Sequence, residues 1–247
     1  MTRPQRITPS ASGARVDDVV RTSGSARRAT LNQLSVLHQS GRVRRLGRGV
    51  YANSERAHAL LPYTDAVRDV ARILGPEFPA LEPVISSTGQ LAHLMHNTPT
   101  REIVFVEVGR QFVGTIAEVL TAAGLIAQPV RMPADMVRLL SLPGDRFVAV
   151  MGVADQRGSE ERDGVRIAGS ERALVDLIVG RTLYGLPLYQ EDIVEAARGL
   201  LQQYDFSVST ARDYARRRGA AAFRETNNIL GSVIAHDPEL TPYRKAL

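Results

Sequence analysis

Cysteine is absent from the 247 residues, and lysine occurs only once, at Lys245. The absence of cysteine excludes disulfides, thiolate nucleophiles and zinc held by thiolates. No apolar run approaches the roughly 18–20 residues that a membrane-spanning helix needs. The opening residues are basic, but no apolar stretch follows them. We therefore expect no secretory signal, no membrane segment and a cytoplasmic protein.

Acidic residues are scarce in the first fifth of the chain. Residues 1–51 contain ten arginines and two acids, a net charge of +8, whereas the remainder has 21 basic and 24 acidic residues, a net charge of −3. A basic end joined to a near-neutral body is typical of proteins that bind nucleic acid. A general preference for arginine over lysine explains the type of basic residue, but not the shortage of acids.

Composition and periodicity divide the chain into four segments. Residues 1–13 are rich in Pro, Ser, Thr and Gly and predict a flexible basic arm. Residues 14–52 form a compact basic pattern, and 53–62 read as a linker. Residues 63–247 predict a larger α/β domain, which is helical over 170–235. Hydrophobic residues make up 44% of the chain, enough for a sizeable core.

Short β-like runs alternate with helical ones in the larger domain. A helix is expected after Thr64 as N-cap, with a stop at Gly75 and Pro76. Ser170 is expected to cap a mostly apolar helix. The other expected elements are strands at 83–86, 103–108, 128–132, 147–153 and 165–168, helices at 88–95, 111–123, 134–141, 190–203, 209–218 and 220–235, and an irregular tail. This alternation predicts a mixed α/β (α+β) fold and leaves the strand directions open.

Residues 14–52 predict a winged helix-turn-helix. Apolar residues at 16, 19 and 20 suit a short packed helix, which 23–25 would break, and a very short helix or turn fits at 26–29. A further helix is expected over 30–40, with three leucines on one side and Gly41 at its end. Two β-prone runs, 42–46 and 50–52, then flank Gly47 and Gly49, which predicts a hairpin with Arg48 at its tip.

The side of the second helix away from its leucines carries groups that read DNA bases. At about 100° per residue, Arg28, Asn32 and Val36 point away from the leucines, together with Ser35 and Gln39. Arginine pairs with guanine, Asn or Gln with adenine, and an apolar side chain contacts the thymine methyl group. The hairpin would lay its arginines along phosphates or into the minor groove. The predicted DNA contacts are Arg27, Arg28, Asn32, Gln33, Val36, Gln39, Arg42, Arg44, Arg45 and Arg48.

A generic helical segment with a basic surface hairpin is the alternative to DNA binding for residues 14–52. The DNA-binding interpretation requires that this segment is not packed against the rest of the chain. It also requires an affinity for duplex DNA that falls as salt is added, because phosphate contacts release counterions.

The stretch Val19–Tyr51 resembles the N-terminal winged helix of AbiEi-type antitoxins, regulators of abortive-infection toxin–antitoxin systems. Four later stretches resemble the C-terminal domain of these proteins: Ile85–His96, Val106–Val108, Ser170–Leu177 and Ser209–Arg218. The resemblance implies a repressor that binds inverted repeats in the promoter of its own operon, an arrangement that suits a dimer on DNA. It also implies neutralisation of a nucleotidyltransferase-like toxin, directly or without a stable complex.

Two other functions stay open at this point. A plain winged-helix regulator would use its α/β domain to sense a small ligand, which predicts an apolar pocket and release of DNA when the ligand binds. A DNA-processing enzyme would use the basic segment for delivery and would need clustered carboxylates that hold a cation. The sequence contains no cofactor motif, and we expect neither an enzyme nor catalytic residues.

Potentially reactive side chains at the start of the larger domain have structural interpretations. His93 and His96 lie three residues apart on an expected helix, but no acid stands nearby at ligand spacing, so we expect no metal site. Ser86, Ser87 and Thr88 follow a strand and begin a helix, which is typical of N-caps rather than of a nucleophile. Glu160, Glu161 and Asp163 are expected in a solvent-facing loop.

Three further charged positions stand out. Glu107 is followed by Arg110 where a restriction-type nuclease would need lysine, which argues against that chemistry. Asp176 lies within an apolar helix and needs a buried partner, for which Arg172 or a residue of Arg216–Arg218 qualifies. The arginine triplet itself suits a helix C-terminus through the helix dipole. A second contact surface, for a toxin or for nucleic acid, is the alternative.

Overall fold

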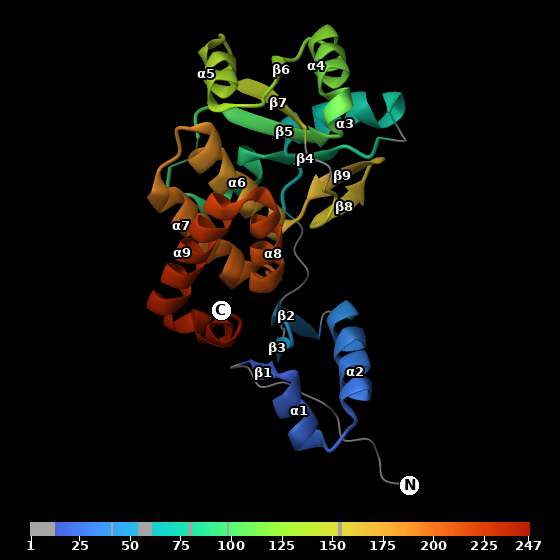
Figure 1. The fold of residues 1–247 in the computed structure, drawn as a ribbon, viewed down its shortest axis with the longest axis vertical. Coiled ribbons are helices and arrows are strands. Elements are labelled where there is room, and N and C mark those ends of the chain that lie inside the picture. Colours follow the sequence, from blue (N-terminus) through green and yellow to red (C-terminus); the bar gives the residue numbers. More distant parts are fainter. Residues whose placement is uncertain (1–12, 41, 54–60, 79–80, 98, 153–154) are drawn as a thin grey trace.

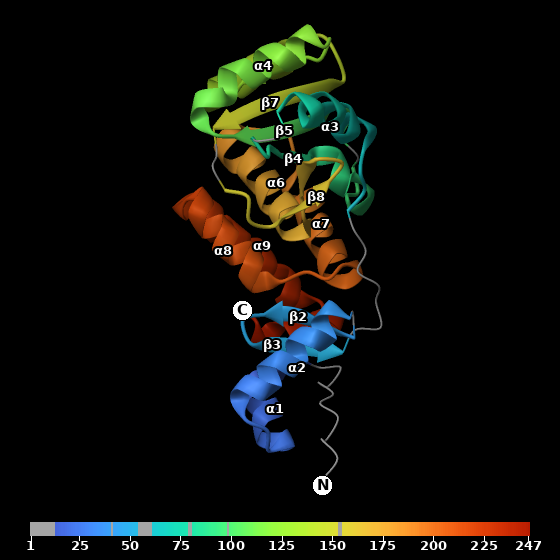
Figure 2. The ribbon, with the colours of Figure 1, turned by 90° about the vertical axis from the view of Figure 1, so that its right-hand side faces the viewer.

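A computed structural model describes residues 13–40, 42–53, 61–78, 81–97, 99–152 and 155–247. The molecule is elongated, with a six-stranded sheet at one end, a small N-terminal unit at the other, and the C-terminal helices between them (Figures 1 and 2). All but one residue of the predicted arm, and most of the predicted linker, lie outside the described residues.

The N-terminal unit contains two helices and a small antiparallel sheet. Its elements are β1 (Ala14–Arg15), α1 (Val16–Ser23), α2 (Arg27–Gln39), β2 (Val43–Gly47) and β3 (Val50–Asn53). The strand order is β1-β3-β2. The separate short helix expected at 26–29 is absent, because α2 begins at Arg27 and the amide of Thr30 bonds to the carbonyl of Ala26 at 3.0 Å. The expected short and long helices are therefore one helix.

A small core holds α1 and α2 against this sheet. Val16 and Val19 from α1 pack with Leu34 from α2, and Val43 and Tyr51 complete the cluster from the sheet. Gly24, with φ 65°, ends α1 in the left-handed conformation and turns the chain toward α2. The spacing of apolar residues thus correctly predicted which side of each helix is buried.

The larger sheet has the order β6-β7-β5-β4-β9-β8. Its strands are β4 (Val84–Ser87), β5 (Glu102–Val108), β6 (Ala127–Pro129), β7 (Arg146–Gly152), β8 (Ser159–Arg162) and β9 (Val165–Ala168). Strands β5, β6 and β7 are parallel, β4 pairs antiparallel with β5 and parallel with β9, and β8 pairs antiparallel with β9. The fold is therefore mixed α/β, as predicted. Strand β8 lies where a loop was expected.

Helices cover both faces of this sheet. The helices α3 (Asp65–Glu77) and α4 (Val113–Ala122) share a core with one face of β5 and β7, whereas α5 (Pro133–Ser141) packs on the other face. Thr64 caps α3 as predicted, since its hydroxyl accepts from the amide of Val67 at 3.3 Å. The predicted stop was early, because α3 includes Pro76 and ends at Glu77. Thr88–Leu94 and Arg110–Phe112 form the 3-10 helices η1 and η2.

The C-terminal part is helical, as predicted. It contains α6 (Ser170–Tyr184), α7 (Gln190–Gln203), α8 (Val208–Arg218) and α9 (Ala220–His236), which share one large core. The residue that caps α6 is Gly169, and Ser170 is its first helical residue. The expected irregular tail forms a 3-10 helix, η3 (Pro238–Lys245), with Leu240 and Tyr243 buried. No helix among the described residues is long and apolar enough to cross a bilayer.

The small sheet is buried on both sides. The face opposite α1 and α2 presents Leu46, Val50 and Ala52, which belong to the core of the C-terminal helices. Gly47 approaches the residue after η3 so closely that an added Cβ would lie 2.7 Å from the Cβ of Ala246. The N-terminal unit is thus fixed to the rest of the chain through the hairpin, while α2 faces outward (Figure 1).

Candidate nucleic-acid interface

The outer face of α2 is exposed and carries no acidic residue. Arg28, Asn32 and Ser35 are exposed on this face, and Val36 is 63% exposed. Thr30 and other residues on the opposite side are buried. The face expected from helical geometry is therefore the one that solvent reaches, and α2 lies near the end of the molecule remote from the six-stranded sheet (Figure 2).

Two more predicted residues of α2 lie at the margins of this face. Gln33 is exposed. Arg27 is exposed too, and its Nε lies 3.1 Å from the carboxylate of Asp17 on α1. A surface ion pair of this kind contributes little to stability, so Arg27 can exchange Asp17 for a phosphate at small cost. Gln39 ends α2, and its side chain lies outside the described residues.

The hairpin divides its arginines between solvent and the protein body. Arg42, Arg45 and Arg48 are exposed. Arg48 occupies the turn, next to Gly49 with φ 69°, so it lies at the predicted tip. Arg44 points the other way: its Nη1 lies 3.3 Å from the Tyr243 hydroxyl, and its guanidinium lies 5.2 Å from the centre of that ring. Arg44 therefore joins the unit to η3 and is not part of the exposed set.

The exposed arginines differ in their electrostatic surroundings. Among the described residues, Arg28, Arg42 and Arg48 have no acidic partner. Arg45 also lacks an ion pair there, but it borders a cavity of about 220 Å³ that is also lined by Glu171 and other acids. The exposed arginines that lack an acidic partner therefore lie mainly on α2 and at the two ends of strand β2.

The requirement that the basic segment stay clear of the body is met only in part. One face of the hairpin is buried against the C-terminal helices, contrary to that requirement. His38, near the end of α2, also approaches Asp205, with 3.6 Å between ring nitrogen and carboxylate. The buried face of the hairpin leaves Arg42, Arg45 and Arg48 exposed to solvent.

A second group of charged residues is buried where β5, α6 and α8 meet. Arg172 has no exposed side-chain surface and bonds to Glu107, which also lies 2.5 Å from Arg218. Asp176 accepts a hydrogen bond from the Tyr214 hydroxyl at 2.8 Å and lies 3.6 Å from the Nε of Arg172. The predicted buried partner of Asp176 is thus confirmed, and Arg218 is a second one at 3.9 Å.

The charges of this cluster are paired with one another inside the protein. Burial, followed by the charge of Asp176, raises the pKa of Glu107, whereas Arg218 and Arg172 oppose that rise. Two carboxylates face two guanidinium groups, so the charges balance. Arginine stays protonated in proteins and neither gives nor takes a proton. The sequence did not predict that Glu107 belongs to this cluster.

The other candidate residues adopt structural roles. The hydroxyl of Ser87 caps η1 by accepting from the amide of Gln90 at 3.3 Å, as the N-cap interpretation predicted. The Nε2 of His93 lies 2.8 Å from the Tyr204 hydroxyl, and His96 is exposed. Within the described part of the chain, no group of three or more His, Asp or Glu residues could hold a metal ion.

Each arginine of the triplet at the end of α8 has a carboxylate partner. Arg216 lies 2.7 Å from Asp213, and Arg217 lies 2.5 Å from Asp155, while Arg218 belongs to the buried cluster. Specific ion pairs therefore add to the helix-dipole interpretation of this triplet. Glu160 and Glu161, expected in a loop, belong to β8, and their side chains are exposed as predicted.

Comparison with known proteins places the chain in a family. A comparison with curated proteins finds no match. Residues 30–230 match the model of a family of unknown function, DUF6577. The matched stretch begins within α2 and extends through the hairpin, the six-stranded sheet and the C-terminal helices into α9. Because the match covers well over half of the sequence, the chain belongs to the DUF6577 family.

Proposed function

We propose that this protein binds duplex DNA through the outer face of α2 and regulates transcription. The observation that carries the proposal is the exposed, acid-free face of α2, with Arg28, Asn32 and Val36 presented together. These side chains match the donor, acceptor and methyl groups that base pairs present in the major groove. A face exposed only for solubility would typically combine acidic and basic residues.

The arrangement of the N-terminal unit supports a winged helix-turn-helix. Two helices joined by a short turn precede a hairpin, and β1 adds a third strand to that hairpin. In such a module the second helix enters the major groove. Arg42 and Arg48, on the outer edge of the hairpin, would contact phosphates beside it. Contact by Arg44 is excluded from the proposal, since that side chain lies against Tyr243.

The resemblance to AbiEi-type antitoxins extends the proposal to a specific role. The protein would repress its own operon in the cytoplasm and neutralise a nucleotidyltransferase-like toxin encoded beside it. This second part rests on the resemblance alone. Its test is co-expression with the neighbouring gene product: growth restored in cells that produce both proteins supports it, and a neighbour whose toxicity is unaffected contradicts it.

A DNA-processing enzyme is disfavoured by the buried cluster. The carboxylates of Glu107 and Asp176 come together, but Arg172 and Arg218 already neutralise them. A carboxylate held in this way is not free to coordinate a catalytic cation.

Two substitutions test DNA recognition. Asn32→Ala should weaken binding to the cognate upstream DNA by about 1–3 kcal/mol and leave binding to unrelated DNA unchanged, because a base contact is lost. Arg48→Ala should weaken binding to all sequences and reduce the salt slope by about 1, because a phosphate contact is lost. Fluorescence anisotropy at several salt concentrations measures both effects.

Arg224→Ala provides the matched control for charge, since Arg224 is exposed on α9, far from α2 in the chain. Its affinity for DNA should equal that of the wild type. Equal losses from Asn32→Ala on cognate and unrelated DNA would contradict base recognition by α2. An affinity that does not respond to salt would contradict the proposal as a whole.

A further inference from the structure

A cleft lies at the carboxyl ends of the three parallel strands β5, β7 and β6. These strands end at Val108, Gly152 and Pro129. After β5 the chain passes into η2 and α4 on one face of the sheet, and after β6 it passes into α5 on the other face. Crevices between connections that leave to opposite faces are the usual ligand sites of parallel sheets.

The size and lining of this cleft suit a small organic molecule with an anionic group. A hollow of about 470 Å³ is lined by Arg110, Arg131, Met151 and Tyr184, among others. It adjoins a more open hollow of about 640 Å³ at Arg217 and Arg218, with Arg110 and Tyr184 common to both. Small-molecule sites typically measure roughly 300–1,000 Å³. Val113 and Val130 also line this hollow but are buried, so the partly exposed Tyr184 supplies apolar surface next to the arginines.

Positive charge in the cleft exceeds what neighbouring carboxylates neutralise. Arg217 is paired with Asp155, and Arg218 with Glu107. Arg110 and Arg131 are both exposed, and among the described residues neither side chain has an acidic partner. The described residues that line the two hollows include no acid. The cleft therefore offers two guanidinium groups that remain available for an anion.

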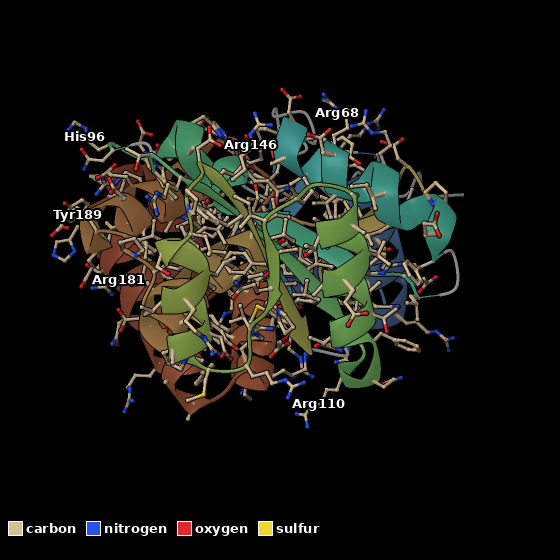
Figure 3. All side chains as sticks on the ribbon, turned by 90° about the horizontal axis from the view of Figure 1, so that it is seen from above. Arg68, His96, Arg110, Arg146, Arg181 and Tyr189 are labelled. Atoms are coloured by element: carbon tan, nitrogen blue, oxygen red, sulfur yellow. The ribbon has the colours of Figure 1, made fainter. Side chains whose placement is uncertain are left out.

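The backbone is shaped to admit Arg110. A Cβ added at Gly152 would lie 2.8 Å from the Cγ of Arg110, so the stem of this arginine rests directly on the end of β7. Packing of the stem restricts where the guanidinium group can move. Figure 3 shows Arg110 projecting at the edge of the molecule near the start of α4, on the side opposite Arg146.

We propose that this cleft binds a small organic phosphate of the nucleotide class. Arg110 and Arg131 would hold the phosphate groups, because the planar guanidinium donates paired hydrogen bonds to phosphate oxygens. The partly exposed ring of Tyr184 would contact the organic part. The site lies on the six-stranded sheet, and it stands independently of DNA binding by α2. It would give the α/β domain a ligand of its own.

Isothermal titration calorimetry on the full-length protein tests the site, with ADP, AMP, adenosine and inorganic phosphate as probes. ADP and AMP should bind, adenosine should bind at least about tenfold more weakly, and added salt should weaken the nucleotides most. Arg110→Gln and Arg131→Gln should each weaken ADP binding by about tenfold or more. Arg146→Gln removes the same charge at the opposite end of β7 and should have no effect.

Other outcomes overturn the proposal. If neither ADP nor AMP binds, the proposed site does not exist. If Arg146→Gln and Arg110→Gln weaken ADP binding equally, the binding reflects general surface charge and not this site. Inorganic phosphate that binds as tightly as AMP removes the nucleoside part of the proposal. Binding of a single-stranded oligonucleotide, with no binding of ADP or AMP, would assign the cleft to nucleic acid instead. Far-ultraviolet circular dichroism of each variant establishes that it is folded.

Discussion

Arg172 carries a charged guanidinium group although its side chain has no exposed surface. Removing an ion from water is costly, so the energetic balance depends on complete pairing. Glu107 and Asp176 supply opposite charge, and the Tyr214 ring lies with its centre 4.9 Å from the guanidinium carbon. The cluster thus joins β5, α6 and α8 through one buried side chain.

Substitution Arg172→Met should lower the free energy of unfolding by about 3–5 kcal/mol, because the two buried carboxylates of Glu107 and Asp176 would then share one guanidinium group, that of Arg218. Urea denaturation followed by circular dichroism measures the loss. Arg224→Met, on the exposed surface of α9, should change stability by at most about 0.5 kcal/mol. A loss from Arg172→Met no larger than that of the control would mean that the ion pairs contribute little.

The two neighbouring roles of arginine in the hairpin can be separated experimentally. Arg44→Ala should lower the free energy of unfolding by about 1 kcal/mol, because it removes contacts with Tyr243, and it should leave the salt slope of DNA binding unchanged. Arg48→Ala should leave stability unchanged and reduce that slope. Urea denaturation measures the free energy of unfolding of both variants, and salt-dependent anisotropy measures the salt slope of their DNA binding. A reduced salt slope for Arg44→Ala with unchanged stability would mean that Arg44 contacts DNA.

At the residue scale, the sequence shows that a buried charge requires a partner more readily than it shows which residue that partner is. Asp176 on an apolar helix requires opposite charge, and Arg172 lies one helical turn away on the same helix, so local geometry was sufficient. The contact of Arg172 with Glu107 spans 65 positions of the chain. Arg44 looked identical to its neighbours because alternation along a strand assigns faces but does not say what covers them.

The helix α5 depends on a capping carboxylate at its start. Asp135 accepts from the amides of Arg131 at 2.8 Å and Met132 at 3.0 Å. These backbone hydrogen bonds, that of Arg131 first, lower the pKa of Asp135 below its usual 3.8, and the nearby Arg138 acts in the same direction. The charged form is therefore the one that the folded state prefers, and its stabilising effect requires a pH above 3.8.

Asp135→Ala should lower the free energy of unfolding by about 1 kcal/mol at pH 7, a typical capping effect. Because the folded-state pKa is depressed, the difference from wild type should stay constant from pH 7 to about 5 and narrow as the pH falls below 3.8. Urea denaturation across this range measures it. A difference that widens on acidification would show that Asp135 is not held in its charged form.

Elements with a strong apolar pattern were predictable, and those defined by tertiary contact were not. Thr64 and the spacing of α3 specified that helix, and the apolar run of β5 specified its strand. Strand β8 is Ser-Glu-Glu-Arg and lies at the edge of the sheet, where pairing with β9 rather than burial makes it a strand. Charged residues are common on edge strands, so composition alone points to a loop there.

At the scale of the whole molecule, the small N-terminal sheet joins two cores. Val43 and Tyr51 face α1 and α2, whereas Leu46 and Val50 face the C-terminal helices. An isolated hairpin is marginal in water, so burial of both faces supplies its stability. The position of α2 relative to the body is therefore set by the C-terminal helices on which the hairpin packs, together with η3, the segment that was predicted to be irregular. Contacts between residues about 200 positions apart, such as Arg44 and Tyr243, leave no local pattern.

Two neighbouring residues of η3 test this coupling. Tyr243 is buried beneath the hairpin, and its hydroxyl donates to the carbonyl of Leu201 at 3.1 Å, whereas Arg244 is exposed. Tyr243→Ala should speed hydrogen exchange of amides in β2 and β3 well beyond any change in β5 and β7, because the hairpin loses the surface on which it packs. Arg244→Ala should leave both regions unchanged. Mass spectrometry of exchanged peptides measures the difference.

Because α2 is held by the same hairpin, Tyr243→Ala should also weaken DNA binding without removing any residue of the interface. Unchanged hydrogen exchange in β2 and β3 would mean that α1 and α2 suffice to hold the N-terminal unit.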